Sequence, residues 1–242
     1  SQQAAIAAFK EFLNGDEQVF MLKGAAGTGK TTLVVEFVRM LEKEARGCFL
    51  MAPTGRAAHI LGSKVGRKAC SIHKGIYGLS ELKSTSQNKD DEDDGGLHMR
   101  FGLKKNDGPT GAVYIVDESS MVSDSMSENE AFVFGFGRLL TDLFEFACGR
   151  KIVFVGDYAQ LPPIEMNFSP ALDKEYIENR FGCKVREVML REVMRQSDGS
   201  VMLANATRIR KAIEDKSFIE FKLDNGIDTV AEDIDLLRPY FD

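Results

Sequence analysis

The stretch "GAAGTGKTT", residues 24–32, has the residue types and the spacing of a phosphate-binding loop. Its glycines let backbone N–H groups turn inward toward phosphate oxygens, and Lys30 can neutralise the β- and γ-phosphates of a nucleotide. Thr31 stands where such loops supply a Mg²⁺ ligand. A glycine-rich turn before a helix is the alternative, but the complete GxxxxGK[ST] match favours nucleotide binding. The candidate ATP-binding residues are Gly24, Ala25, Ala26, Gly27, Thr28, Gly29, Lys30, Thr31 and Thr32.

A second stretch, "VYIVDESSM" at residues 113–121, ends an apolar strand in two adjacent carboxylates. We expect Asp117 to share a Mg²⁺ ion with Thr31, and Glu118 to polarise an attacking water from the other side of the chain. An Asp-Glu pair alone is more often a solvated strand end. Together with the loop above, the pair predicts a site that hydrolyses a nucleotide.

A third stretch, "VFVGDYAQLPPI" at residues 153–164, ends a strand on Asp157 and continues to Gln160 and a proline pair. Ligands of open α/β sheets bind outside the carboxyl ends of the strands, so we expect Gln160 near the γ-phosphate. An amide can donate to phosphate and accept from water without adding negative charge. The prolines would fix the direction of Gln160, although they could also simply end a strand in a tight turn.

These stretches need a sheet whose strands end at one common edge. Apolar β-rich segments alternate with amphipathic helical patterns along the chain, which is the rhythm of a parallel sheet. The sequence therefore predicts an α/β fold with a doubly wound parallel sheet. The expected strands are 19–22, 49–52, 112–116 and 151–155, and the expected helices include one from Thr31 and one at about 138–147.

Two stretches interrupt this rhythm. Residues 83–111 are polar, acidic at their centre and rich in Gly, Asn and Asp. This composition leaves two alternatives, a disordered loop or an inserted β-hairpin formed by residues 78–84 and 97–103. Residues 123–129 have the composition of an ordinary surface connection.

Composition limits the class of protein. The 242 residues, 43% of them hydrophobic, can bury one substantial core and begin a second. No apolar run approaches the ~18–20 residues of a membrane span and no leader opens the chain, so we expect a cytoplasmic protein. The four scattered cysteines predict reduced thiols and no metal site. The net charge of -6 includes the acidic run 90–94, so the remaining chain is near neutral and can carry a basic groove.

Two further stretches, "APTGRAA" (52–58) and "SIH" (71–73), complete a set of five with those above. In chain order, the set resembles the motifs of superfamily 1B DNA helicases of the RecD-like, Dda-type group. The resemblance covers nearly the whole chain and implies a RecA-like P-loop NTPase fold. It also implies ATP and Mg²⁺ as cofactors, a monomeric motor moving 5′ to 3′, single-stranded and duplex DNA as partners, and replication or recombination proteins as further partners.

The resemblance implies roles around the nucleotide. In these helicases the "GDxxQLPP" element couples the γ-phosphate to bound DNA, which implies that Gln160 is a phosphate sensor. "QQAAI" at residues 2–6 resembles the Q motif and implies an adenine contact by Gln2. "LREVMRQ" at residues 190–196 resembles motif IV and implies that Arg195 is an arginine finger, although a surface arginine beside an acid is the alternative. The candidate catalytic residues are Lys30, Glu118, Gln160 and Arg195.

The same resemblance implies DNA contacts. "APTGRAA" resembles motif Ia, in which Pro53 and Thr54 line the DNA channel and Arg56 reaches a phosphate; Thr54 can also cap a helix. "SIH" implies contacts by Ser71 and His73, although a lone histidine is more often structural. The candidate DNA-binding residues are Pro53, Thr54, Arg56, Ser71, His73 and Phe101.

Phe101 belongs to the insertion at about residues 78–111, which corresponds in position to the small 1B hairpin that separates duplex strands. There its ring could stack on a base. The resemblance implies a RecA-like domain 1A at residues 1–184 and the beginning of a second RecA-like domain, 2A, at residues 185–242. Later motifs of the family are not found, so we expect an N-terminal fragment that is weakly active or inactive alone.

Two other classes of function remain open. A P-loop phosphotransferase would need an acceptor pocket and a lid, and it would leave "GDYAQLPPI" without a role. A nucleotide-dependent binding module without motor activity would not need the intact set of Lys30, Thr31, Asp117 and Glu118.

Overall fold

A computed structural model describes residues 2–84, 97–127, 131–191 and 201–214. The chain divides into two compact units, Ser1–Glu192 and Val193–Asp242. In the second unit the described residues form the helix α7 (Val201–Glu214). The boundary expected after residue 184 differs from this division by one strand, β9 (Val185–Leu190), which lies in the first unit.

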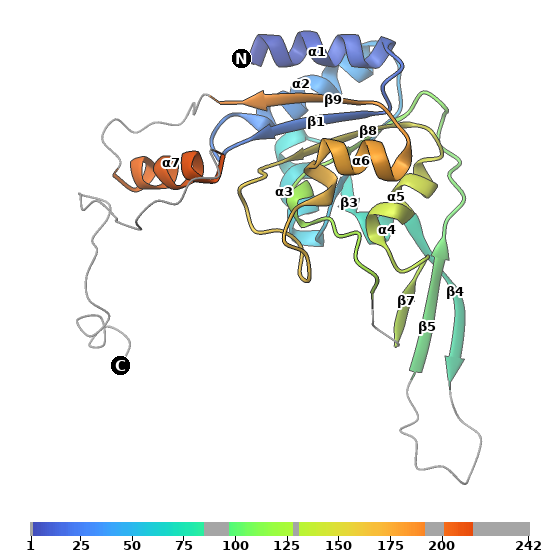
Figure 1. Cartoon of the computed structure of the whole chain (residues 1–242). Coiled ribbons are helices and arrows are strands. Elements are labelled where there is room, and N and C mark those ends of the chain that lie inside the picture. Colours follow the sequence, from blue (N-terminus) through green and yellow to red (C-terminus); the bar gives the residue numbers. More distant parts are fainter. Residues whose placement is uncertain (1, 85–96, 128–130, 192–200, 215–242) are drawn as a thin grey trace, which may run out of the picture. The chain divides into compact units, whose positions relative to one another are not determined.

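Six parallel strands form the central sheet of the first unit (Figure 1). Their order is β3-β2-β6-β8-β1-β9, so strands that are distant in the sequence lie side by side. Every residue of β1 and β6 is buried, because helices cover both faces of the sheet. The predicted doubly wound α/β fold is confirmed. Besides β9, the strands of this sheet are β1 (Val19–Gly24), β2 (Cys48–Ala52), β3 (Ala69–Ser71), β6 (Val113–Val116) and β8 (Lys151–Gly156).

The two faces of the sheet have separate cores. Against one face pack α1, α2 and α3, with Phe9 stacked on Phe37 at 3.9 Å between ring centroids and Phe20 edge-on to both. Against the other face pack α4, α5 and α6, around Tyr114 and Phe154. The helices of this unit are α1 (Gln2–Asn14), α2 (Lys30–Lys43), α3 (Gly55–Val65), α4 (Ile72–Ile76), α5 (Leu139–Ala147) and α6 (Lys174–Phe181), with short 3₁₀ turns η1 (Ser119–Met121) and η2 (Pro170–Leu172).

A second, three-stranded sheet extends away from the central one (Figure 1). Strands β4 (Tyr77–Ser84) and β5 (Leu97–Leu103) pair antiparallel, and β7 (Phe132–Phe134) pairs parallel with β5. The hairpin alternative for the insertion is therefore correct. The acidic run at residues 90–94 lies outside the described residues.

One buried carboxylate connects this hairpin to the rest of the first unit. Asp142, in the first turn of α5, is fully buried and accepts a hydrogen bond of 2.6 Å from the Tyr77 hydroxyl, at the start of β4. It also accepts from the Phe136 N–H, shortly after β7, at 3.1 and 3.2 Å to its two oxygens. Burial raises the pKa of the Asp142 carboxyl. Both outer strands of the hairpin sheet are thus fixed to one helix.

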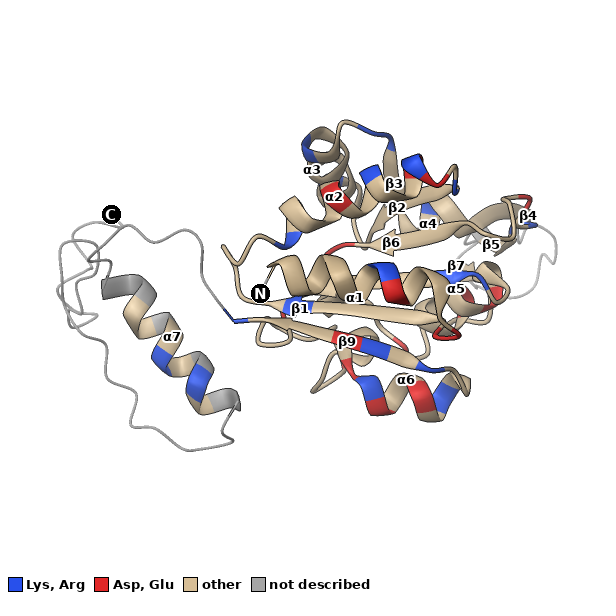
Figure 2. Cartoon of the chain, turned by 90° about the horizontal axis from the view of Figure 1, so that it is seen from above, with Lys and Arg blue, Asp and Glu red and all other residues tan. Residues whose placement is uncertain are grey.

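Most charged side chains of the first unit are at least partly exposed, and Asp124, Asp142 and Asp157 are among the buried exceptions. Figure 2 shows both signs of charge along α6 and on β9, while most of the central strands carry neither. Along the parts of the chain that the structure describes, no helix combines the length and the apolar character needed to cross a membrane.

Candidate nucleotide-binding and hydrolysis site

The loop between β1 and α2 has the backbone of a phosphate cradle. Gly27 and Gly29 have φ angles of +82° and +88°, a region that side-chain-bearing residues rarely adopt. Gly29 is the N-cap of α2, without a side-chain capping bond, and the first turn of α2 contains no acidic residue. The amides at this helix start therefore remain free of a competing carboxylate and can face an anion.

The side chains of the loop curve back over the same space. Lys30 Nζ donates to the carbonyl oxygens of Gly24 and Ala25 at 2.6 and 2.9 Å. Thr28 donates to Ala25 O at 2.8 Å. A Cβ on Gly24 would lie 2.7 Å from Thr28 Oγ1 and 2.9 Å from the Leu190 side chain, so this position requires glycine. The positive charge of Lys30 therefore lies beside the first two residues of the loop.

Two carboxylates follow β6. Asp117 accepts the Glu118 N–H at 3.0 Å, and its own N–H donates to Met51 O at the end of β2. Burial raises the pKa of the Asp117 carboxyl, while the Glu118 N–H and the charge of Lys30 act in the opposite direction. The φ of Glu118 is +52°, which turns the chain sharply after Asp117. The lysine and the carboxylate therefore interact across the site.

The donor set fits a magnesium nucleotide. Thr31, half-buried in the first turn of α2, offers a hydroxyl, and Asp117 offers carboxylate oxygens. Mg²⁺ prefers oxygen ligands and commonly combines one or two protein groups with substrate phosphates and water. Among the described residues no group of three or more His, Cys, Asp and Glu side chains is arranged to hold a metal by itself. A cation at this site would therefore depend on the phosphates for its remaining ligands.

The turn after β8 is organised by Asp157. This residue is buried, accepts the Ala159 N–H on Oδ1 at 3.1 Å, and accepts the Gln160 N–H on its carbonyl oxygen at 3.1 Å. Gln160 itself is exposed, and its Oε1 accepts a hydrogen bond from Ser120 Oγ at 3.2 Å. Ser120 is fully buried two residues after Glu118. The turn is thus joined directly to the end of β6.

Sequence reasoning did not single out Ser120. The sequence shows only that Ser120 lies close to the carboxylate pair, and a serine at such a strand end is commonly an exposed polar residue. The structure instead buries it, and Ser169 Oγ donates to Ser120 O at 3.0 Å. Its hydroxyl fixes the orientation of the Gln160 amide, so that the Nε2 donor faces away from this bond.

Gln2 lies against the phosphate loop. Its Nε2 donates to Thr28 O at 3.5 Å, and a Cβ on Gly29 would overlap that same nitrogen. The first turn of α1 is therefore in contact with the loop that precedes α2, and an adenine contact by Gln2 remains a prediction. Arg195 lies outside the described residues.

Comparison with known proteins identifies the family. A family model described as "AAA domain" matches residues 1–231. The chain belongs to this AAA domain family.

The AAA domain also resembles individual helicases. It is 28% identical over 149 residues to the ATP-dependent RecD2 DNA helicase of Deinococcus radiodurans, covering 61% of this chain and 16% of that protein. It is 28% identical over 155 residues to the ATP-dependent DNA helicase Pif1 of Bdellovibrio bacteriovorus, covering 64% and 31%. The expected relationship to RecD-like helicases is confirmed. The chain spans less than a third of the length of either relative.

A solved structure shares the fold. The Pif1 helicase from Candida albicans superimposes with a TM-score of 0.52 at 19% sequence identity, over 87% of this chain and 43% of that one. The predicted RecA-like P-loop fold of the AAA domain agrees with this likeness.

The candidate DNA-binding residues of motif Ia lie at the same edge of the sheet. Thr54 follows β2 and caps α3 by accepting the Ala57 N–H at 3.2 Å. Pro53 is half-buried beside it and Arg56 is exposed. Ser71 ends β3 and caps α4 by accepting the Lys74 N–H at 3.2 Å. The capping alternative for Thr54 is thus correct, and the exposed start of α3 could still face a phosphate.

His73 and Phe101 lie in an aromatic cluster of the AAA domain. The His73 ring contacts Phe134 edge-on at 5.1 Å and Tyr77 at 5.6 Å between centroids. Phe101 stacks on Phe134 at 4.7 Å and packs against the core. The structure places Phe101 at the base of the hairpin with its ring half-buried, because β7 supplies a stacking partner. DNA contacts by these two residues remain predictions.

His73 should make the stability of the AAA domain depend on pH. Burial lowers the pKa of its imidazole, and the charge of Asp142 opposes this only partly. The unfolded chain then takes up a proton near pH 6.5, before the folded chain does, so the free energy of unfolding falls as the pH drops through this range. We expect the denaturation midpoint of the wild type to fall more between pH 7.5 and 5.5 than that of His73→Phe. Parallel pH curves for the two proteins would contradict this assignment.

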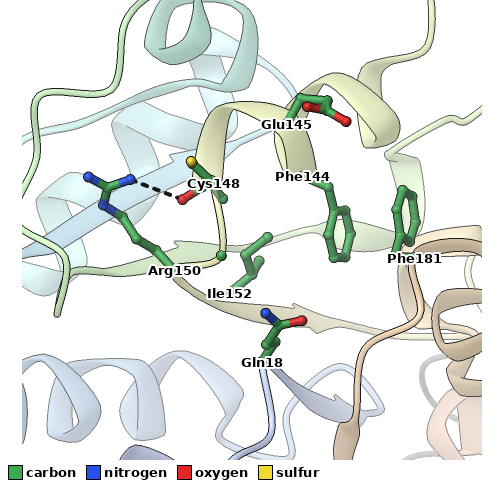
Figure 3. A pocket seen from close by; sticks show the side chains of 9 residues that line it. Gln18, Phe144, Glu145, Cys148, Arg150, Ile152 and Phe181 are labelled. Carbon is green, nitrogen blue, oxygen red and sulfur yellow. Dashed lines mark hydrogen bonds between the residues drawn. The ribbon is translucent and has the colours of Figure 1, made fainter.

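A cavity of about 390 Å³ lies at the opposite end of the sheet (Figure 3). Gln18 and Ile152 line it at the starts of β1 and β8, together with Cys148 and Phe181. Arg150, also at its wall, donates to Ala147 O at 3.2 Å. The cavity is therefore separate from the nucleotide site, which lies at the carboxyl ends of these strands.

Proposed function

We propose that this AAA domain is the ATPase motor part of a DNA helicase, which couples ATP hydrolysis to 5′-to-3′ movement on single-stranded DNA and to duplex unwinding. One observation carries the proposal. The phosphate loop, the Gln160 turn and the Asp117–Glu118 pair follow β1, β8 and β6, three adjacent parallel strands. The helicase names of the relatives support the choice of DNA as the partner.

In the proposed mechanism, bound MgATP supplies the electrophilic γ-phosphate and a divalent charge that withdraws electrons from it. Lys30 exchanges its bonds to the loop carbonyls for phosphate oxygens and stabilises their negative charge. Glu118 orients the attacking water and accepts its proton. Gln160 donates from Nε2 toward the phosphate, with its amide oxygen held by Ser120. Arg195, which lies outside the described residues, is proposed to stabilise the transition-state charge.

The DNA contacts are proposed to lie on the next two strands of the sheet. Thr54 and Ser71 follow β2 and β3, and the Asp117 N–H bonds to Met51 O of β2 at 3.0 Å. A displacement of the carboxylate turn during hydrolysis would therefore be transmitted to the strand that precedes Thr54. This path supports a coupling between nucleotide state and grip on the DNA backbone.

Other parts of the proposal concern the whole protein. Residues 185–242 are proposed to lead into a second RecA-like domain, although β9 itself pairs with β1 in the central sheet. Replication or recombination proteins are proposed as further partners of a monomeric motor. The hairpin, by its position, is the proposed strand-separating element.

The test is the steady-state rate of ATP hydrolysis with and without single-stranded DNA, in the protein that carries this chain, with Lys30→Ala as the background. We expect DNA to raise the Lys30-dependent rate by about tenfold or more, as coupled sites typically do. A rate that DNA leaves unchanged, together with salt-independent DNA binding, would reject the motor. Phosphate transfer to a small acceptor would then identify a phosphotransferase.

A further inference from the structure

The turn that joins β7 to α5 holds an aromatic side chain outside the core. Gly135 and Gly137 flank Phe136 with φ angles of +49° and +83°. Gly135 N donates to Phe101 O at 2.8 Å, Gly137 N donates to Phe134 O at 2.7 Å, and Gly137 O accepts the Ser127 N–H at 2.8 Å. Each residue of the turn is therefore tied to the hairpin sheet or to a neighbouring loop.

Asp142 fixes the middle of this turn. Both of its carboxylate oxygens accept the Phe136 N–H, and a Cβ on Gly135 would overlap them. Asp142 is itself fully buried and bonded to Tyr77, so it cannot follow a moving loop. The direction of the Phe136 side chain is thus set by the core of the domain.

The ring that this turn presents is 65% exposed. Phe134, two residues earlier, packs against Phe101 and His73, so the same segment contains one inward and one outward ring. Exposed phenylalanine is unfavourable in water, and a flexible loop would let the ring fold back onto apolar surface. Here the hydrogen bonds of the turn keep the ring in solvent, as a binding residue requires.

The charge of the surrounding elements indicates the chemistry of the partner. Residues 71–84 and 97–107, which include α4, β4 and β5, contain five basic residues and two acidic ones, Glu81 and Asp107. Four of the basic residues, Lys74, Arg100, Lys104 and Lys105, are exposed, and Lys105 lies 3.5 Å from Asp107. In a chain with a net charge of -6, this local excess of positive charge favours a polyanion as the partner. The exposed Phe136 ring favours a partner that also has flat apolar faces. Single-stranded nucleic acid has both properties.

We propose that Phe136 stacks on a base of single-stranded DNA at the base of the hairpin, with Asp142 as the residue that positions it. This inference rests on the proposed function and adds a contact outside the helicase-like motifs. The basic side chains bind the flanking phosphates, and the ring binds the base without reading its identity, because every base has a π-face.

The experiment measures the affinity of the protein for a short fluorescent oligonucleotide across a series of salt concentrations. Phe136→Ala should weaken binding by about 5-fold or more, since that is the contribution of one stacked base. Phe136→Trp should retain the affinity, and Phe136→Leu should resemble alanine, because leucine keeps apolar area but has no ring. Phe132→Ala, which removes another exposed ring from β7, is the matched control and should change little.

The salt dependence separates stacking from charge. Phe136→Ala should lower the affinity equally at all salt concentrations, whereas Arg100→Ala should reduce the slope of log affinity against log salt by about 0.7, the value for one phosphate of a single strand. Affinity unchanged in Phe136→Ala, or restored by leucine, would overturn the inference and indicate a protein partner for this ring. A wild type that binds no single-stranded DNA would overturn the proposed function as well, so the two failures are distinguishable.

Discussion

Replacing Glu118 with glutamine is expected to lower kcat for ATP hydrolysis by about 10²–10⁴-fold, the usual contribution of a general base. Glutamine has the same size and can still point at the attacking water, but it cannot accept the proton. The phosphate loop lies on β1 and not on the Glu118 turn, so KM for ATP should change little. Steady-state kinetics with and without DNA measure both constants.

The matched control for this variant is Glu175→Gln, which makes the same chemical change on an exposed position of α6. It should leave both constants unchanged. A loss of kcat below about tenfold in Glu118→Gln would show that another group takes the proton. A large rise in KM would show instead that Glu118 supports nucleotide binding.

Replacing Asp142 with alanine is expected to lower the free energy of unfolding by about 3 kcal/mol, because it leaves one buried and one partly buried donor without their acceptor and opens a cavity. The donors are the Tyr77 hydroxyl and the Phe136 N–H. Denaturant unfolding followed by circular dichroism gives the value. The same variant should weaken binding of single-stranded DNA, since the turn that holds Phe136 loses its anchor.

A double-mutant cycle that combines Tyr77→Phe with Asp142→Ala isolates the hydrogen bond between these two side chains. Tyr77→Phe alone should cost about 1 kcal/mol, and nearly nothing once Asp142 is alanine. Asp142→Asn, which retains one acceptor oxygen, should fall between the wild type and alanine. Additive losses in the cycle would show that the 2.6 Å contact contributes no stability.

The nucleotide site was predictable because its parts are contiguous in the sequence. Each of its three motifs combines a buried strand with the polar residues that follow it, so strand and side chain could be read together. The contact between Ser120 and Gln160 could not be predicted, because it joins two strand ends that are 40 residues apart.

The hairpin sheet shows why other parts of the structure could not be predicted from the sequence. β7 has only three residues, too few for a periodic pattern, and the sequence before it resembles a surface connection. Without β7, the sequence does not show that Phe101 and His73 both contact Phe134. β3 is equally short, with three residues, and β9 lies directly before the stretch 190–196 that resembles motif IV, so the sequence did not indicate that it pairs with β1.

The order of the central sheet bears on how the protein is made. β1 leaves the ribosome more than a hundred residues before β8, yet Val19 pairs with Ile152 of β8 on one side and with Val185 of β9 on the other. Pairing between such distant segments is slow, and an apolar strand that awaits its neighbours offers an edge for aggregation. The nascent chain therefore needs protection until residue 190 has been synthesised, and only then can the nucleotide site close around the end of β1.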